Sequence, residues 1–108
     1  MRKETKATDF TKAVKEAIAE RDSFDGWPCC IVCGTPAPQE NRIAFSNAHF
    51  IGRAQGGRGI VENGLTLCPV CHRRYDQSTE RSRLKAYFAD YLKSMHDGWD
   101  ESELYYRR

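Results

Sequence analysis

The chain has 108 residues, of which 40% are hydrophobic and 30% are charged, and its net charge is only +2. This composition is typical of one small globular domain spanning residues 1–108, and it excludes an intrinsically disordered chain. Because no apolar run approaches the roughly 18 residues that a membrane span needs, and because the polar residues 1–7 do not begin a secretory signal, we expect a cytoplasmic protein that has no membrane partner.

The first predicted element is an amphipathic helix over residues 8–22. Phe10, Val14 and Ile18 recur at four-residue steps, which places them on one face of a helix. The following residues, 23–40, contain three prolines and two glycines, so we predict a loop there rather than a regular element.

Four of the five cysteines form two Cys-x-x-Cys pairs, Cys30 with Cys33 and Cys68 with Cys71. In a cytoplasmic chain such pairs indicate metal binding before disulfides, and four thiolates suit a closed tetrahedral Zn²⁺ site that stabilises a small fold. The alternative is a set of reduced, buried thiols. The fifth cysteine, Cys29, is predicted to be a small packed residue outside this zinc knuckle.

The 34 residues between the two cysteine pairs predict a β-hairpin. Its strands are expected over residues 43–50 and over residues 60–61 and 65–67, on either side of a glycine-rich loop. A helix is then expected from Pro69 to about Tyr75, because proline is favoured at the first helical position. A long helix over residues 79–95 and a short one over residues 99–104 follow, so the predicted fold class is α+β.

Positive charge is concentrated in the middle of the chain. Residues 42–74 hold five arginines and a single acid, Glu62, which gives this third a net charge of +4 and leaves −2 for the remainder. Arginine is the side chain best suited to a bidentate contact with phosphate. We therefore predict that this region contacts phosphate groups.

Two histidines and an asparagine form a pattern in the same region. Asn63 lies fourteen residues after His49, and His72 lies nine residues after Asn63, with an arginine and a Gly-Gly pair following the first histidine. Together with the Leu-Cys-x-x-Cys-His junction at residues 67–72, this pattern resembles the zinc-stapled branch of the HNH endonucleases, also called His-Me finger or ββα-metal nucleases. The resemblance covers residues 30–76. It implies a small ββα-metal core with a four-cysteine zinc site, flanked by the N-terminal helix at residues 8–22 and by C-terminal helices at residues 79–108.

The resemblance also implies an activity, that of a metal-dependent DNA endonuclease which hydrolyses phosphodiester bonds. His49 would be the general base that takes a proton from the attacking water, in keeping with the pKa range of histidine. Asn63 would orient His49 or brace the hairpin loop. His72 would be a ligand of a catalytic Mg²⁺ or Mn²⁺ ion.

One position departs from the family pattern. Many members have an Asp or His immediately before the base histidine as a second metal ligand, and here that residue is Ala48. Asp76 offers a substitute, because it lies four residues after His72 and therefore on the same face of the predicted helix. His72, Asp76, waters and the substrate phosphate would then surround the ion.

Each of these residues also has a structural interpretation. A single histidine on an apolar strand is often a packed, hydrogen-bonded residue, and Asn63 followed by Gly64 is an ordinary turn signal. His72 is an alternative zinc ligand, and Asp76 is an alternative ion-pair partner of Arg73.

Four arginines flank the proposed site: Arg53 and Arg58 in the glycine-rich loop, and Arg73 and Arg74 on the metal-bearing helix. They are predicted to hold the backbone of double-stranded DNA without reading its sequence, since no recognition helix is evident. One site handles one strand at a time, so we expect a monomer or weak homodimer that nicks with little sequence specificity. Compact stand-alone members resemble phage proteins, which implies partners in phage DNA packaging or processing and, for a phage protein, the cytoplasm of a bacterial host.

Two other functions compete with the nuclease. A non-catalytic, zinc-stabilised module that binds nucleic acid needs the cysteines and arginines but no histidine pattern, and Ala48 favours it. A zinc-knuckle adaptor for a protein partner would use C-terminal apolar residues as its contact surface, namely Trp99, Leu104, Tyr105 and Tyr106. A redox protein is excluded, because two Cys-x-x-Cys pairs without a βαβ context do not resemble thioredoxin.

Overall fold

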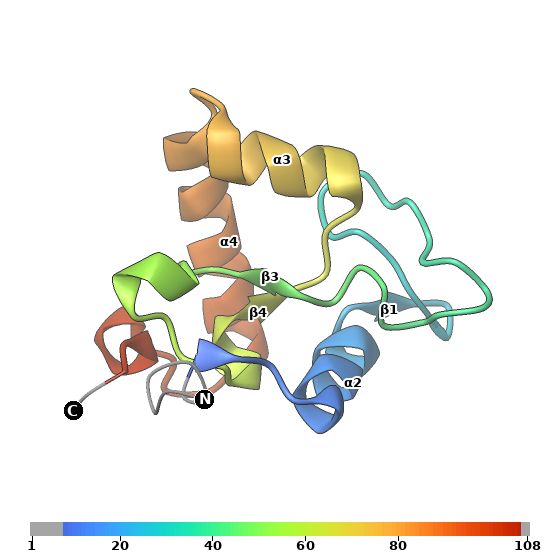
Figure 1. The fold of residues 1–108 in the computed structure, drawn as a ribbon, viewed down its shortest axis with the longest axis horizontal. Helices are drawn as coiled ribbons and strands as arrows, with labels where there is room; N and C mark the ends of the chain where they lie inside the picture. Colours follow the sequence, from blue (N-terminus) through green and yellow to red (C-terminus); the bar gives the residue numbers. More distant parts are fainter. Residues whose placement is uncertain (1–7, 107–108) are drawn as a thin grey trace.

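The computed structural model describes residues 8–106. Three α-helices and two small antiparallel sheets form this part of the chain, which confirms the predicted α+β class. In chain order (Figure 1) the elements are α2 (Lys12–Arg21), β1 (Ser23–Phe24), β2 (Trp27–Pro28), β3 (Ala48–His49), the 3₁₀ turns η1 (Arg53–Gln55) and η2 (Val61–Asn63), β4 (Gly64–Leu65), α3 (Pro69–Gln77), α4 (Arg81–Met95) and the 3₁₀ turn η3 (Glu101–Leu104). No helix within residues 8–106 has the length and apolar character needed to cross a membrane.

The N-terminal helix α2 begins at Lys12, which is later than the predicted start at residue 8. The reason is a cap: the hydroxyl of Thr11 accepts a hydrogen bond from the amide of Val14 at 3.2 Å. The residues before the cap, including Phe10, therefore do not continue the helix and lie against the central hairpin instead.

Residues 23–28 form a hairpin rather than the predicted loop. β1 pairs antiparallel with β2, and the two strands are joined by Asp25 and Gly26, whose φ angles are 55° and 84°. Two consecutive residues with positive φ make a type I′ turn, for which an Asp-Gly pair is a strong sequence signal. The prolines and glycines of residues 23–40 favoured a loop in the sequence analysis, and the hairpin signal of the Asp-Gly pair was missed.

The central hairpin is shorter than its predicted strands. β3 pairs antiparallel with β4, and His49 lies opposite Gly64. Residues 41–46 make turns instead of extending β3, as shown by the amide of Ser46, which donates to the carbonyl of Ile43 at 3.1 Å. The turn η2 likewise replaces the start of the returning strand.

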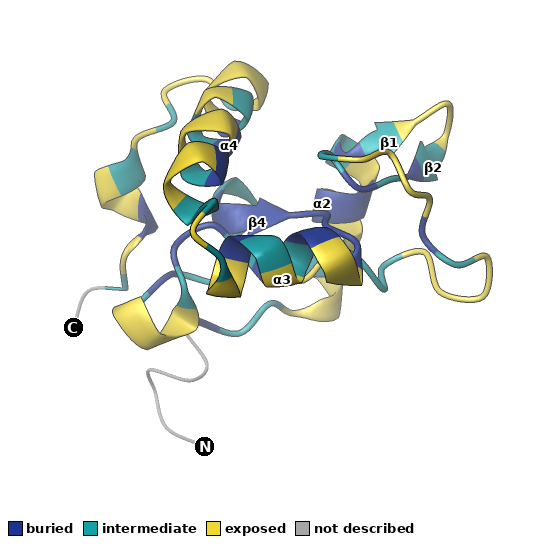
Figure 2. Ribbon diagram, turned by 90° about the horizontal axis from the view of Figure 1, so that it is seen from above, coloured by how far each residue is buried: buried dark blue, intermediate teal, exposed yellow. Residues whose placement is uncertain are grey.

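Helices α3 and α4 cover the hairpin. In Figure 1 the hairpin lies between α3 above and α2 below, with α4 running behind it, and Figure 2 shows that the buried residues of α4 turn inward. Tyr75 of α3 is fully buried, and its hydroxyl donates to the carbonyl of Phe50 at 2.8 Å. Its ring packs edge-on against Phe88 of α4, with the ring centroids 5.0 Å apart. This contact joins all three elements in one core.

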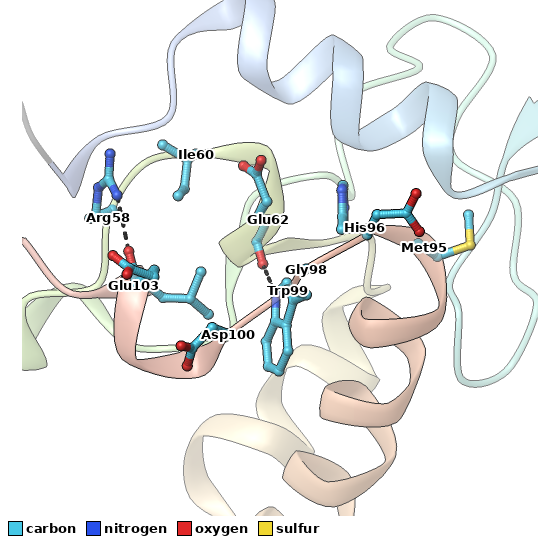
Figure 3. Close-up of a pocket in the computed structure, with 11 residues that line it drawn as sticks. Arg58, Ile60, Glu62, Met95, His96, Gly98, Trp99, Asp100 and Glu103 are labelled. Carbon is cyan, nitrogen blue, oxygen red and sulfur yellow. Dashed lines mark hydrogen bonds between the residues drawn. The ribbon is translucent and has the colours of Figure 1, made fainter.

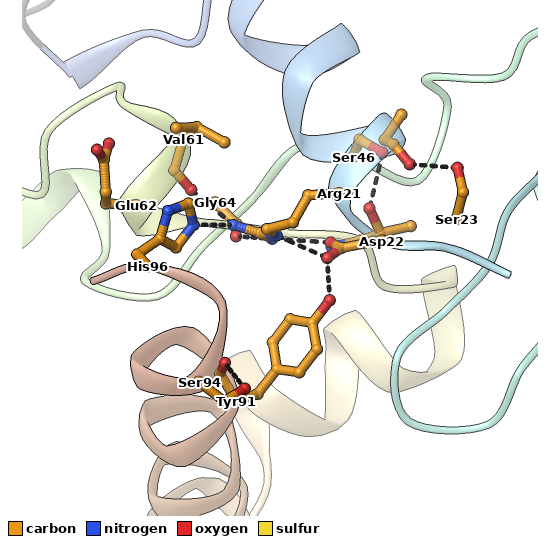
Figure 4. Close-up of polar contacts among 12 residues, drawn as sticks. Arg21, Asp22, Ser23, Ser46, Val61, Glu62, Gly64, Tyr91, Ser94 and His96 are labelled. Atoms are coloured by element: carbon orange, nitrogen blue, oxygen red, sulfur yellow. Dashed lines mark hydrogen bonds and ion pairs between the residues drawn. The ribbon is translucent and has the colours of Figure 1, made fainter. Parts of the chain in front are cut away.

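A buried ion pair joins α2 to the hairpin and to α4 (Figure 4). The side chain of Asp22 is 0% exposed and that of Arg21 is 8% exposed, and Arg21 Nε donates to Asp22 Oδ1 at 2.7 Å. Arg21 also donates to the carbonyls of Val61 at 2.8 Å and Gly64 at 2.6 Å. The hydroxyl of Tyr91 on α4 donates to Asp22 as well. This network fixes the N-terminal helix against the rest of the core.

His96 gives the network a pH dependence. Its Nε2 lies 3.1 Å from Arg21 Nη1, and because a guanidinium group only donates, His96 must accept this hydrogen bond in its neutral form. Burial first, and then the charge of Arg21, lower the pKa of His96 below its ordinary 6.5, while the nearby acids Glu62 and Asp22 only partly oppose this. The native state therefore binds fewer protons than the unfolded chain, so acid favours unfolding.

We expect the free energy of unfolding to fall as the pH falls below 6.5, and to fall less steeply in His96→Gln. The glutamine amide oxygen can accept the hydrogen bond from Arg21 but does not titrate. Urea unfolding at about pH 7.5 and about pH 5.5 measures the difference, which has a ceiling of about 1.4 kcal/mol per pH unit. The same acid loss in both proteins would show that His96 does not contribute.

Candidate functional site

Four cysteine side chains converge beside the start of α3. The Sγ atoms of Cys30, Cys33, Cys68 and Cys71 all lie within 4.8 Å of one another, and those of Cys33 and Cys68 are 3.6 Å apart. Around a tetrahedral Zn²⁺ with Zn–S bonds of about 2.3 Å, sulfur atoms are separated by about 3.8 Å, so this donor set fits zinc. The predicted cysteine cluster is confirmed, and Cys29 is not one of its members.

Backbone turns hold both cysteine pairs in place. In the first pair, the amide of Gly34 donates to the carbonyl of Cys30 at 2.9 Å, and the φ of Gly34 is 81°, a left-handed turn that suits glycine. In the second pair, Cys68 is the N-cap residue of α3. Hydrogen bonds from Thr35 lower the pKa of Cys33 to about 6, which favours the thiolate that a metal ion requires.

The two predicted site histidines meet at a separate, open depression of about 520 Å³. His49, at the end of β3, and His72, in the first half of α3, both line it. The other lining residues are Asp9, Phe10, Lys15, Asn47 and Arg53. The fold therefore places the two histidines of the sequence pattern at one surface.

The residues before α2 fix the ring of His49. Its Nε2 lies 2.7 Å from the carbonyl oxygen of Thr8, and because a carbonyl only accepts, Nε2 carries the hydrogen and Nδ1 of the neutral ring holds a lone pair. The ring of Phe10 stacks on the imidazole with centroids 4.0 Å apart and planes inclined by 13°. Burial lowers the pKa of His49 below 6.5 and outweighs the opposing effect of the Thr8 carbonyl. At neutral pH the ring is therefore neutral, with one basic nitrogen.

Asn63 holds the glycine-rich loop closed. Its side chain is fully buried, and its Oδ1 accepts a hydrogen bond from the amide of Ile51 at 2.7 Å. Its Nδ2 donates to the carbonyls of Ile51 at 3.1 Å and Arg58 at 2.9 Å. A Cβ on Gly57 would lie 1.8 Å from the Ile51 carbonyl oxygen, so the loop reaches this closure only with glycine there. These hydrogen bonds correspond to the bracing alternative for Asn63.

His72 and Asp76 face each other on α3, as their helical spacing predicts. His72 Nε2 lies 3.2 Å from Asp76 Oδ2, and the two side chains are 33% and 51% exposed. A nitrogen and a carboxylate within reach of water are donors that fit Mn²⁺ or a partly hydrated Mg²⁺. Ala48, by contrast, is fully buried and supplies no ligand.

Comparison with known families identifies this arrangement. Residues 30–78 match the family model described as HNH endonuclease. Residues 30–78 are an HNH endonuclease domain. The match spans the cysteine cluster, His49, Asn63 and His72, and it ends just after α3, so the resemblance found in the sequence is confirmed. No curated protein and no solved structure matches the chain.

The arginines predicted to contact DNA lie in different settings around the HNH domain. Arg53 lines the depression and forms an ion pair with Asp9, whereas Arg73 is exposed on α3. Arg74 is held by Glu80, to which its Nε and Nη2 donate at 3.0 Å and 2.7 Å. These hydrogen bonds lower the pKa of Glu80 to about 2. Arg53 is thus the predicted arginine that shares a surface with both histidines.

Arg58 lies at another depression, of about 550 Å³, between the HNH domain and the C-terminal residues (Figure 3). Its Nη1 donates to the carbonyl of Glu103 at 3.0 Å. The carboxylate side chains that line this depression are Glu62, Asp97, Asp100 and Glu103. Acidic surroundings repel phosphate, and Arg58 does not line the depression of the two histidines.

The HNH-domain depression also contains residues that sequence reasoning missed. Asp9, Phe10 and Lys15 come from the N-terminal part of the chain, outside the matched residues. Phe10 was expected on the apolar face of a helix, but it stacks on His49. The carbonyl of Thr8 also contacts His49, from 41 positions away in the sequence. No local sequence signal indicates contacts between residues so far apart.

We expect Asn63→Ala to lower the free energy of unfolding by about 2–4 kcal/mol, because three backbone groups, two of them in buried hydrogen bonds, lose their partners. Urea unfolding measures the loss, and faster hydrogen exchange at the Ile51 amide locates it. Asn41→Ala is the matched control, since the side chain of the exposed Asn41 accepts one hydrogen bond, from the amide of Ile43 at 3.3 Å. That control should lose less than about 1 kcal/mol, and an equal loss in both variants would contradict the bracing role.

Proposed function

We propose that this chain is a metal-dependent endonuclease that hydrolyses phosphodiester bonds of double-stranded DNA. The observation that carries the proposal is the depression at which His49 and His72 lie together, on two elements of the HNH domain. Hydrolysis needs a base for the attacking water and a positive charge beside the leaving 3′-oxygen. In this proposal the neutral His49 is the base, and a metal ion held by His72 and Asp76 supplies the positive charge.

His49 is the proposed general base. With its Nε2–H donated to the Thr8 carbonyl, Nδ1 is the nitrogen that takes the proton of the attacking water. The lowered pKa keeps this nitrogen unprotonated at neutral pH. The Thr8 carbonyl then stabilises the imidazolium that forms, because its hydrogen bond favours the protonated ring.

His72 and Asp76 are the proposed ligands of a catalytic Mg²⁺ or Mn²⁺ ion. When bound, such an ion neutralises the scissile phosphate and stabilises the leaving oxygen. The cysteine cluster is proposed to hold a structural Zn²⁺, which fixes the start of the helix that carries both ligands.

Basic side chains at and near the depression are proposed to hold the DNA backbone. Lys15 and Arg53 line it, and Arg73 projects from the same helix as His72. Contacts to phosphate position a duplex without reading its sequence, so we expect little sequence specificity. With one site per chain, a monomer or weak homodimer would nick one strand at a time. A setting in phage DNA packaging or processing rests on the family resemblance alone.

Supercoiled plasmid tests the activity directly. We expect relaxed circles to accumulate with Mg²⁺ or Mn²⁺ and not with EDTA, and His49→Ala to lower the rate at least about 100-fold. His96→Gln is the matched control, because His96 belongs to the Arg21 network and does not line the depression. Equal nicking by the wild type and His49→Ala would show that His49 is not the base.

The second candidate function is a non-catalytic, zinc-stabilised module that binds nucleic acid. The buried Ala48 favours it, because the position that supplies a metal ligand in many HNH endonucleases supplies none here. This function predicts plasmid that is retarded on a gel at low salt and is not nicked with either metal ion. That result would replace the nuclease with the binding module.

A further inference from the structure

Thr8 and Phe10 lie outside the HNH-matched residues 30–78 and yet contact His49, which lines the depression. The carbonyl of Thr8 lies 2.7 Å from His49 Nε2, and the ring of Phe10 lies nearly parallel to the imidazole, at 4.0 Å. One short segment thus supplies both the hydrogen-bond acceptor and the flat surface that contact His49. Within the HNH match itself, Asn63 directs its side-chain hydrogen bonds to the loop instead.

This segment is anchored at three points. Asp9 forms an ion pair with Arg53 of the loop, and Thr11 immediately begins α2 as its cap. The backbone of Asp9 also packs directly on Gly59, where a Cβ would lie 2.1 Å from the Asp9 carbonyl oxygen. A side chain at Gly59 would therefore displace the segment without touching His49.

We propose that residues 8–10 are a positioning segment of the active site, which holds the His49 ring with Nε2–H bonded to the Thr8 carbonyl and leaves Nδ1 as the proton acceptor. The proposal rests on the proposed nuclease function. Phe10 acts through His49 and is a positioning residue. It fixes the plane of the imidazole, so that the ring does not rotate away from the attacking water. Misplacement of a catalytic group by about 1 Å can lower a rate by about 100-fold, so a segment that fixes the His49 ring has a large effect on the rate.

The test uses the zinc-loaded full chain and two readouts, the NMR signal of the hydrogen on His49 Nε2 and the kinetics of plasmid nicking. That hydrogen is visible only while a hydrogen bond protects it from exchange with water. We expect the signal in the wild type, and its loss in Gly59→Ala and in Phe10→Ala. In both variants kcat should fall about tenfold or more, with KM for plasmid changed less than about twofold.

Two further variants separate positioning from folding. Gly52→Ala is the matched control in the same loop, because a Cβ there would meet only Gln55 Oε1, at an ordinary 3.7 Å. It should keep the signal and the wild-type kcat. Phe10→Trp restores a flat ring and should recover both readouts, which a general loss of stability would not allow. If Gly59→Ala does not fold, the comparison of Phe10→Ala with Phe10→Trp tests the proposal.

Retention of the Nε2 signal and of kcat in Phe10→Ala would overturn the proposal. A different result bears on the proposed function: a wild type that shows the protected signal but nicks no plasmid would overturn the nuclease. Such a protein would still contain the contact between residues 8–10 and His49, so the two failures are distinguishable.

Discussion

Removal of zinc from the cysteine cluster is expected to unfold the HNH domain. Three of the four cysteines, Cys30, Cys68 and Cys71, are buried, and the cluster joins the first knuckle to the N-terminus of α3. Structural zinc contributes about 10–16 kcal/mol in zinc-finger peptides, which is as large as the whole stability of most domains, roughly 5–15 kcal/mol. A chelator, or Cys71→Ala, should therefore abolish the cooperative thermal transition.

Circular dichroism and metal analysis together measure this effect. We expect one zinc ion per wild-type chain, and loss of both the ion and the thermal transition in Cys71→Ala. Cys29→Ala is the matched control, because Cys29 lies outside the cluster and its Sγ donates only to the carbonyl of Trp27. A Cys71→Ala protein that keeps its zinc and its melting temperature would show that the cluster is not a structural metal site.

Asp22→Ala is expected to lower the free energy of unfolding by about 3–5 kcal/mol, the range found when one partner of a buried ion pair is removed. The carboxylate of Asp22 is fully buried and accepts from Arg21, from the Tyr91 hydroxyl and, at 3.0 Å, from the amide of Thr66. Its removal leaves the charge of Arg21, whose side chain is 8% exposed, without a counter-ion. All three neighbours lose a hydrogen bond at once.

Urea unfolding with a fixed zinc content tests this expectation. Asp90→Ala is the control, because Asp90 is an exposed aspartate of α4. It should change the free energy of unfolding by less than about 0.5 kcal/mol. If Asp22→Ala loses no more than this control, the Arg21–Asp22 pair does not stabilise the fold.

Those parts of the fold that depend on spacing could be predicted from the sequence. The two Cys-x-x-Cys pairs predicted a four-cysteine cluster, and the separation of four residues placed His72 and Asp76 on one helix face. The helix at Pro69 was predicted because proline is favoured at a first helical position, and α3 begins there. Each of these signals is local, so tertiary packing did not override it.

Other features depend on contacts that no local pattern contains. The predicted strand over residues 43–50 is reduced to two residues, because turns before Ala48 use the backbone groups that a longer strand would pair. The segment that holds His49 was predicted to be helical, since the apolar steps from Phe10 fit a helix face. Only the folded chain shows that the Thr11 cap ends that pattern and directs Phe10 to the histidine.

The adjacency of Cys71 and His72 has a consequence for the rotational phase of α3. Successive residues of an α-helix are turned by about 100° around its axis, so the direction in which Cys71 points determines the direction of His72. A metal ion that fixes Cys71 in the core would thereby also fix the direction in which the His72 side chain leaves α3, toward the depression. One inserted residue between them would leave the four cysteines in place and turn His72 by about 100° around the helix axis. A structural ion bound at the cysteines would therefore also set the direction of the proposed ligand of the catalytic ion.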